Sequence, residues 1–84
     1  MKIKLKYFSW IRVKLKKGID QINMPENSSL SELFYELEND NLIFKEINKD
    51  PSIKIFLNLK EIKDKSVSLR DGDEVAFLPP VTGG

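Results

Sequence analysis

The residues of this chain that could take part in chemistry lie at its C-terminus, which reads FLPPVTGG. Pro79 and Pro80 fix the backbone dihedral φ and cannot extend a central β-ladder, so they should project the chain off a sheet as a stiff spacer. Gly83 and Gly84 lack side chains, and such backbone can thread a channel too narrow for a Cβ atom. We therefore expect the Gly84 carboxylate to be presented inside another protein.

A carboxylate becomes reactive only when one of its oxygens is turned into a good leaving group. Adenylation by ATP does this, and a sulfur or nitrogen nucleophile can then take the acyl group. The chain has no Walker-type phosphate loop, and its four glycines are too sparse for a dinucleotide-binding fingerprint. We expect no bound cofactor in this chain and a separate activating enzyme that uses ATP. The alternative is a passive end, because most chain termini are disordered.

The composition excludes most other chemistry. The 84 residues contain no Cys and no His, so thiolate nucleophiles, disulfides, the commonest general base and the commonest transition-metal ligands are all missing. Three acids, Asp71, Asp73 and Glu74, surround one glycine, but this pattern is more typical of a turn than of a metal loop. We expect no metal site and no catalysis by this chain alone.

The charge distribution argues against nucleic-acid and membrane partners. Several lysines near the N-terminus alternate with aromatic residues, which could be read as a nucleic-acid patch. The net charge is only +1, however, and a solvated strand face explains the same lysines. The N-terminus also lacks the continuous apolar stretch of a signal peptide, so we expect a cytoplasmic protein.

Three segments show clear secondary-structure patterns. Residues 2–8 alternate polar and apolar side chains, which predicts a half-buried strand. Ser29 and Glu32 have the spacing of a capping box, and an apolar stripe at 30, 33, 34 and 37 predicts the main helix. Residues 74–78 form the last strand, after a turn at 71–73.

The other elements are predicted less sharply. Ser9 could cap a short helix through Leu15, and Gly18 could end it in the left-handed conformation. Residues 19–24 alternate as a second strand, which Pro25 stops.

The third quarter of the chain is the least regular. Residues 42–52 are compatible with a loop or a short helical turn, residues 53–59 read as a strand, and residues 61–63 read as a small return strand. One main helix on one face of a mixed sheet indicates a two-layer α+β domain. The order and length favour a ubiquitin-like β-grasp roll over residues 1–78, followed by an extended tail over residues 79–84.

Strand parity predicts which side chains face solvent. If Ile3, Leu5 and Tyr7 pack on the helix, Phe8 shares the wet face with the lysines at positions 2, 4 and 6. If Val75 and Phe77 are core, positions 74, 76 and 78 are exposed. Phe8 and Leu78 would then form an apolar patch near the tail. Such a patch indicates either partner docking or plain edge packing.

At this point the sequence resembles a known family. The stretch DGDEVAFLPPVTGG resembles the C-terminus of molybdopterin synthase small subunits, which are sulfur carriers of the MoaD/ThiS group with a β-grasp fold. The stretch YFSWIR, which contains Arg12, is similar to the aromatic end of the family's first strand. MPENSSLSEL is similar to the family's segment leading into the helix.

The resemblance implies a specific function in molybdenum cofactor biosynthesis. An E1-like activating enzyme would adenylate the C-terminal Gly84, which would become a thiocarboxylate with Gly83 as its thin neighbour. The tail would insert into the large subunit of molybdopterin synthase, in a heterotetramer, and donate sulfur to cyclic pyranopterin monophosphate. The partner-binding residues would be those on the wet face and the tail: Phe8, Arg12, Leu78, Pro79, Pro80, Val81 and Thr82.

Two features depart from the family pattern. An Asn-Gly turn commonly follows the third strand, whereas this chain has Asn58-Leu59, and the usual Arg-Glu pair after the first strand is Arg12-Val13 here. Neither touches the tail, so the hairpin geometry is more in question than the function. Carriers for thiamine or tRNA thiolation, ubiquitin-like modifiers and passive interaction modules remain alternatives.

Overall fold

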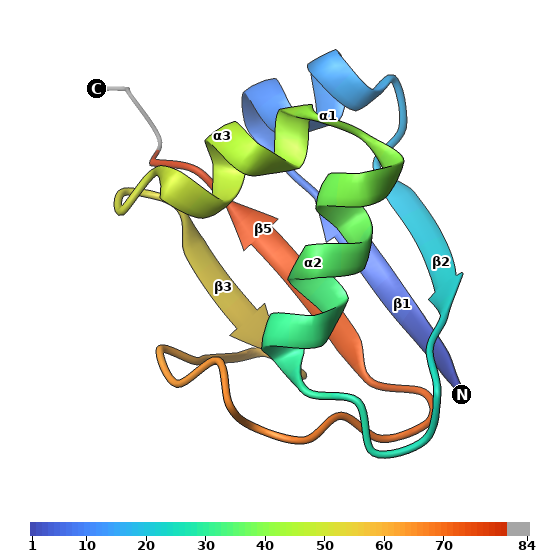
Figure 1. Ribbon diagram of the computed structural model, residues 1–84. Helices are drawn as coiled ribbons and strands as arrows, with labels where there is room; N and C mark the ends of the chain where they lie inside the picture. Colours follow the sequence, from blue (N-terminus) through green and yellow to red (C-terminus); the bar gives the residue numbers. More distant parts are fainter. Residues whose placement is uncertain (81–84) are drawn as a thin grey trace.

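The computed structural model describes residues 1–80 and shows a five-stranded mixed sheet with three helices (Figure 1). The elements in chain order are β1 (Lys2–Tyr7), α1 (Ser9–Leu15), β2 (Ile19–Asn23), α2 (Leu30–Asp40), α3 (Ile43–Lys49), β3 (Lys54–Leu57), β4 (Lys60–Glu61) and β5 (Glu74–Leu78). The spatial order is β2-β1-β5-β3-β4, with β5 parallel to β1 and the other neighbours antiparallel. This is the expected β-grasp fold. None of the helices among residues 1–80 is long and apolar enough to cross a membrane.

The last strand lies in the middle of the sheet. Leu5 of β1 pairs with Val75 of β5, and Ile55 of β3 pairs with Phe77 of β5. Because paired residues point to the same side, the inward residues of all three strands meet on one face. Ile3, Leu5, Tyr7, Val75 and Phe77 are buried there, as the alternation predicts.

Helix α2 begins where the sequence predicts. The backbone N–H of Glu32 donates to Ser29 Oγ, and the backbone N–H of Ser29 donates to Glu32 Oε1, each over 3.1 Å. This capping box satisfies two backbone donors that the first turn leaves free. The apolar stripe of α2 is buried against the sheet, and the helix ends at Asp40.

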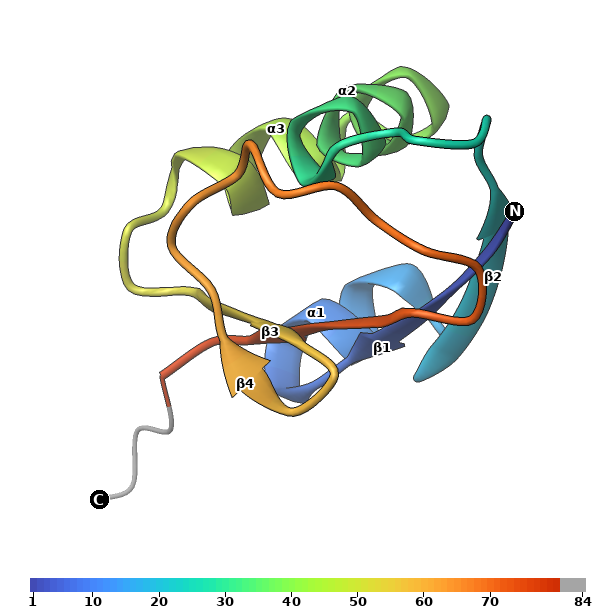
Figure 2. The same ribbon diagram turned by 90° about the horizontal axis from the view of Figure 1, so that it is seen from below.

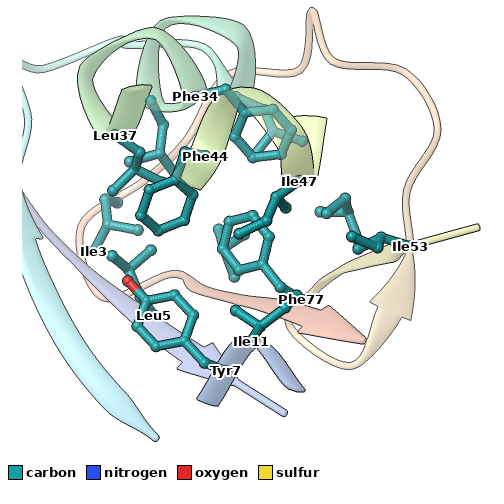
Figure 3. Close-up of a cluster of buried hydrophobic side chains, with 14 of the residues drawn as sticks. Ile3, Leu5, Tyr7, Ile11, Phe34, Leu37, Phe44, Ile47, Ile53 and Phe77 are labelled. Carbon is teal, nitrogen blue, oxygen red and sulfur yellow. The ribbon is translucent and has the colours of Figure 1, made fainter. Parts of the chain in front are cut away.

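Helix α3 resolves the ambiguous stretch after α2. It is two turns long, and its N-cap residue, Leu42, makes no side-chain capping bond. The backbone N–H of Ile43 donates instead to Asn41 Oδ1 over 3.1 Å, outside the usual capping position, so the sequence signal for this helix is weak. Phe44 and Ile47 of α3 are buried beside α2 (Figure 3). The Phe77 ring lies 5.7 Å from the Phe44 ring and 5.6 Å from the Phe34 ring, so both helices pack on the central strand. Figure 2 shows α2 and α3 on the same side of the sheet.

The first helix ends at Leu15, as expected, but both of its expected capping residues were wrong. Ser9 is its first residue and not its cap, and the N-cap, Phe8, makes no side-chain capping bond. At the other end Lys16, with φ of 61°, takes the left-handed conformation assigned to Gly18. Gly18 serves a different purpose: a Cβ there would meet Arg12 Nε at 3.1 Å, so the glycine leaves room for that side chain.

The β3–β4 hairpin is shorter than expected. β3 ends at Leu57, two residues before the predicted end, and the return strand covers Lys60–Glu61 in place of residues 61–63. Asn58 and Leu59 form the two-residue connection and both have positive φ, 50° and 72°. Positive φ at both central residues is the pattern of a type I′ turn, whose twist matches the flanking strands.

Candidate functional site

The face of the sheet opposite α2 and α3 carries the candidate site. Phe8, which follows the last paired residue of β1, is 43% exposed there, on the side of Lys2, Lys4 and Lys6, as the parity argument predicts. Lys6 Nζ lies 3.2 Å from Glu74 Oε1 on the neighbouring strand. No other ion pair forms between side chains of this face among the described residues, so Lys2 and Lys4 contribute positive charge to it.

An apolar hollow runs along β5 on this face, from Glu74 at the start of the strand to Leu78 at its end, and we call it the open-face hollow. Its volume is about 250 Å³, and it is lined by Lys6, Phe8, Phe56, Leu59, Glu74, Ala76 and Leu78. Phe8 and Leu78, the two residues that the sequence proposed as a patch, are thus brought together. Such a concave apolar surface with charged residues at its edge can receive an apolar side chain from another protein.

The expectation that position 76 is exposed was wrong. Ala76 is only 7% exposed, although it points to the open face. It is paired with Lys6 on one side and Phe56 on the other, and these longer side chains flank the small alanine. Ala76 is therefore on the floor of the hollow, and the longer side chains of Lys6 and Phe56 form its walls.

Arg12 lies beside the open-face hollow and not in it. Its exposed side chain packs over Gly18 and lines a second hollow of about 460 Å³, together with Lys6, Tyr7, Phe8 and Ile19. Phe8 and Lys6 line both hollows, so they form the wall between them. The predicted partner residues Phe8, Arg12 and Leu78 therefore belong to one continuous stretch of surface.

Sequence reasoning missed two residues of the open-face hollow. Phe56 could have been found, because strand parity that buries Ile55 turns Phe56 outward. Leu59 could not, because its position depends on where the hairpin turns. It is the most exposed large apolar residue of residues 1–80, at 82%.

The hairpin turn beside the hollow is held by a hydrogen-bond network. Asn58 Nδ2 donates to Asp73 Oδ1, and the backbone N–H of Glu74 donates to Asn58 Oδ1, each over 2.9 Å. Asp73 Oδ2 accepts from the backbone N–H of Arg70 over 2.8 Å. The acids around Gly72 therefore act in a turn, as the sequence suggests, and Gly72 has φ of 87°. Nowhere in residues 1–80 do three potential metal-ligating side chains gather.

The Tyr7 phenol, which lines the second hollow, has no acid–base role at neutral pH. Burial, with smaller contributions from the Asp20 and Asp40 carboxylates, raises the pKa of the Tyr7 phenol well above its ordinary value. Tyr7 is thus a neutral part of the core, in contact with Phe77 and Phe44. The surface around the hollows therefore offers a partner its shape, apolar contacts and lysine charge.

The chain runs from this site into its tail. β5 ends at Leu78, Pro79 is buried and Pro80 is exposed. The predicted tail residues Val81, Thr82, Gly83 and Gly84 lie outside the described residues. The described chain therefore continues for two residues, Pro79 and Pro80, beyond the strand that forms the floor of the hollow.

Comparisons with known proteins agree with this fold. A family model, described as the ThiS family, matches residues 5–84. A putative molybdopterin converting factor subunit 1 from Pyrococcus furiosus is 29% identical with a TM-score of 0.82, covering 96% of this chain and 99% of its own. The corresponding subunit in a complex of subunits 1 and 2 of the molybdopterin-converting factor from Helicobacter pylori is 27% identical with a TM-score of 0.70, covering both chains fully.

A further neighbour shares the fold with less sequence similarity. A small archaeal modifier protein from Haloferax volcanii is 16% identical with a TM-score of 0.85, and all of both chains is covered. The match over residues 5–84 spans nearly the whole sequence and includes the sheet, the helices and the C-terminal glycines. This chain belongs to the ThiS family of ubiquitin-like sulfur carriers.

Proposed function

We propose that this protein is the sulfur-carrying small subunit of a molybdopterin synthase. The observation that carries the proposal is the position of the open-face hollow: it extends along β5 as far as Leu78, after which the tail begins, so one partner could hold both. The neighbours of 29% and 27% identity, which are molybdopterin-converting subunits, support this carrier role over the other roles in the family.

The chemistry would take place on the Gly84 carboxylate. One carboxylate oxygen attacks the α-phosphorus of ATP in an E1-like enzyme, which releases pyrophosphate and leaves an acyl adenylate. Hydrosulfide supplied by a sulfur donor then attacks the acyl carbon and displaces AMP, so that a thiocarboxylate remains after loss of a proton. In the large subunit the thiocarboxylate sulfur would attack a carbon of cyclic pyranopterin monophosphate and displace an oxygen substituent, which forms a thioester. Hydrolysis of this thioester by water would leave the sulfur on the substrate and restore the Gly84 carboxylate.

The domain would supply binding and positioning in this cycle. Two of the exposed large apolar residues, Phe8 and Leu59, line the hollow that reaches Leu78 at the end of β5. Docking of Phe8 and Leu78 on the large subunit would direct the tail residues Pro79, Pro80, Val81 and Thr82 into the active-site channel. Arg12 would contact the partner at the edge of that surface. Two carriers and two large subunits would form the heterotetramer.

The proposal is tested by intact-mass spectrometry. We expect the protein, incubated with ATP, a sulfur donor and the E1-like enzyme of its own organism, to gain the mass of one oxygen replaced by one sulfur. A variant lacking Gly84 should show no such gain. Leu42→Ala, which changes an exposed leucine between α2 and α3, is the matched control and should react like the wild type.

A second step separates the alternatives. The thiocarboxylated protein is mixed with the large subunit and cyclic pyranopterin monophosphate, and molybdopterin formation supports the proposal. A thiocarboxylate that the large subunit cannot use would overturn the molybdopterin role and point to thiamine or tRNA thiolation. Conjugates to lysines of other proteins would indicate a modifier, and the absence of any adduct would indicate a passive module.

A further inference from the structure

Leu59 occupies a conformation that disfavours its side chain. Five residues other than glycine have positive φ among residues 1–80, and Leu59 is the only apolar one. At φ of 72° a Cβ atom crowds the neighbouring carbonyl oxygen, which is why glycine prevails at this position of a type I′ turn. The preceding residue, Asn58, is suited to its place, because asparagine tolerates positive φ and its amide is hydrogen-bonded.

The leucine contributes little to its own fold. Its side chain is 82% exposed and does not belong to the core cluster. In the neighbouring turn at residues 71–73, the residue with positive φ is a glycine, Gly72, with φ of 87°, which carries no such strain. Leu59 and Gly72 line the same small hollow of about 260 Å³. A strained, exposed and apolar side chain therefore needs an explanation outside the folding of the free protein.

The surroundings of Leu59 indicate what it contacts. It lines the open-face hollow together with Phe8, Phe56 and Leu78. On its other side it lines the small hollow with Lys4 and Glu74. Glu74 is paired with Lys6, whereas Lys4 has no ion-pair partner among the described residues. Leu59 thus separates the apolar open-face hollow from a smaller hollow whose unpaired charge is that of Lys4. The complementary surface has an apolar side chain next to a carboxylate.

We propose that Leu59 is a specificity-determining anchor for the large subunit, which would place an apolar side chain in the open-face hollow and a carboxylate near Lys4. This inference rests on the proposed function, because it takes the large subunit as the occupant. The strain in the turn fixes the leucine at the edge of the hollow before binding, so less side-chain and loop freedom is lost on association.

Two substitutions at position 59 distinguish the effect of the leucine side chain on binding from the effect of its positive φ on stability. Leu59→Ala removes the anchor and keeps a Cβ at positive φ, whereas Leu59→Gly removes both. We expect each variant to weaken binding of the organism's own molybdopterin synthase large subunit about tenfold, measured by isothermal titration calorimetry. Leu59→Gly should also raise the melting temperature of the free protein, and Leu59→Ala should not. Leu42→Ala should change neither quantity.

The outcomes distinguish this inference from the proposed function. If the wild type does not bind the large subunit, the proposed function fails and the inference with it. If the wild type binds and Leu59→Ala binds equally well, the proposed function stands and the anchor is overturned. If Leu59→Gly lowers the melting temperature, the leucine stabilises the turn itself, which also overturns the inference.

Discussion

On the face of the sheet that α2 and α3 cover, Leu5 and Phe77 have at most 1% of their surface exposed, whereas on the opposite face Phe8 has 43%. Both faces come from the same strands, because alternate residues of β1 and β5 point in opposite directions. The covered face contains a continuous apolar cluster, and the open face contains apolar residues among lysines. Burial by the chain itself accounts for the first set, and burial by a partner would account for the second.

The largest effect should come from the covered face. Phe77→Ala would remove a ring that contacts Phe34, Phe44 and Tyr7 in the centre of the core. We expect the free energy of unfolding to fall by about 3–5 kcal/mol, measured by urea denaturation. A loss no greater than that of Phe8→Ala would show that the two faces do not differ in this way.

Phe8→Ala should have its main effect on binding. Because Phe8 is largely solvated on one side, the free energy of unfolding should change by less than about 1 kcal/mol. Its removal opens the wall between two hollows, so affinity for the large subunit should fall about tenfold in a binding titration. Tyr35→Ala, an exposed aromatic on α2, is the control and should leave affinity unchanged.

A smaller effect is expected from the helix that covers the closed face. Ser29→Ala removes the acceptor for the Glu32 amide, so the free energy of unfolding should fall by about 1 kcal/mol. Ser31→Ala is the matched control, since the Ser31 side chain makes no hydrogen bond within the described residues. Equal losses in both variants would mean that helix propensity, and not the cap, determines the effect.

The smallest effect concerns two loops at the side of the sheet. Hydrogen bonds from the Ser52 side chain and backbone lower the pKa of Asp50, and Ser66 lowers that of Asp64 in the same way. A lowered pKa means that the folded state favours the charged form. This contribution is present above the ordinary value of 3.8 and is lost as pH falls through the lower folded-state pKa.

Replacing both Asp50 and Asp64 by asparagine should therefore make the stability fall less steeply as the pH is lowered. The melting temperature, measured between about pH 5 and pH 2, would show this difference. The variant Asp71→Asn serves for comparison with the double variant, because Asp71 accepts a hydrogen bond from a backbone N–H, that of Lys2, and not from a serine. If the double variant loses stability in acid as steeply as the wild type, the Asp–Ser hydrogen bonds make no measurable contribution.

The sequence predicted the covered face well because its signals are local. The capping box at Ser29 and the alternation through β1 each depend on residues close in the chain, and both are confirmed. The N-cap residue of helix α3, Leu42, makes no side-chain capping bond, and the sequence leaves this helix ambiguous because its stability comes from burying Phe44 and Ile47 against the rest of the fold. Contacts of that kind cannot be read from seven residues alone.

The open face was predicted only in part for a related reason. Parity placed Phe8 and Leu78 together, but the exposure of position 76 depends on the neighbours Lys6 and Phe56 across two strand pairings. Leu59 was missed because a shift of two residues in the hairpin decides whether it lies in a strand or a turn. The roles of Gly83 and Gly84 stay predictions, since they lie outside the described residues.

The central position of β5 has a mechanical consequence. A partner that draws the tail inward pulls on Leu78 along the strand axis, and β5 is bonded to β1 on one side and β3 on the other. Force in this direction shears both ladders at once, so many hydrogen bonds resist together and none can be peeled off singly. The position of β5 therefore favours a domain that stays folded while a partner pulls on its C-terminal tail.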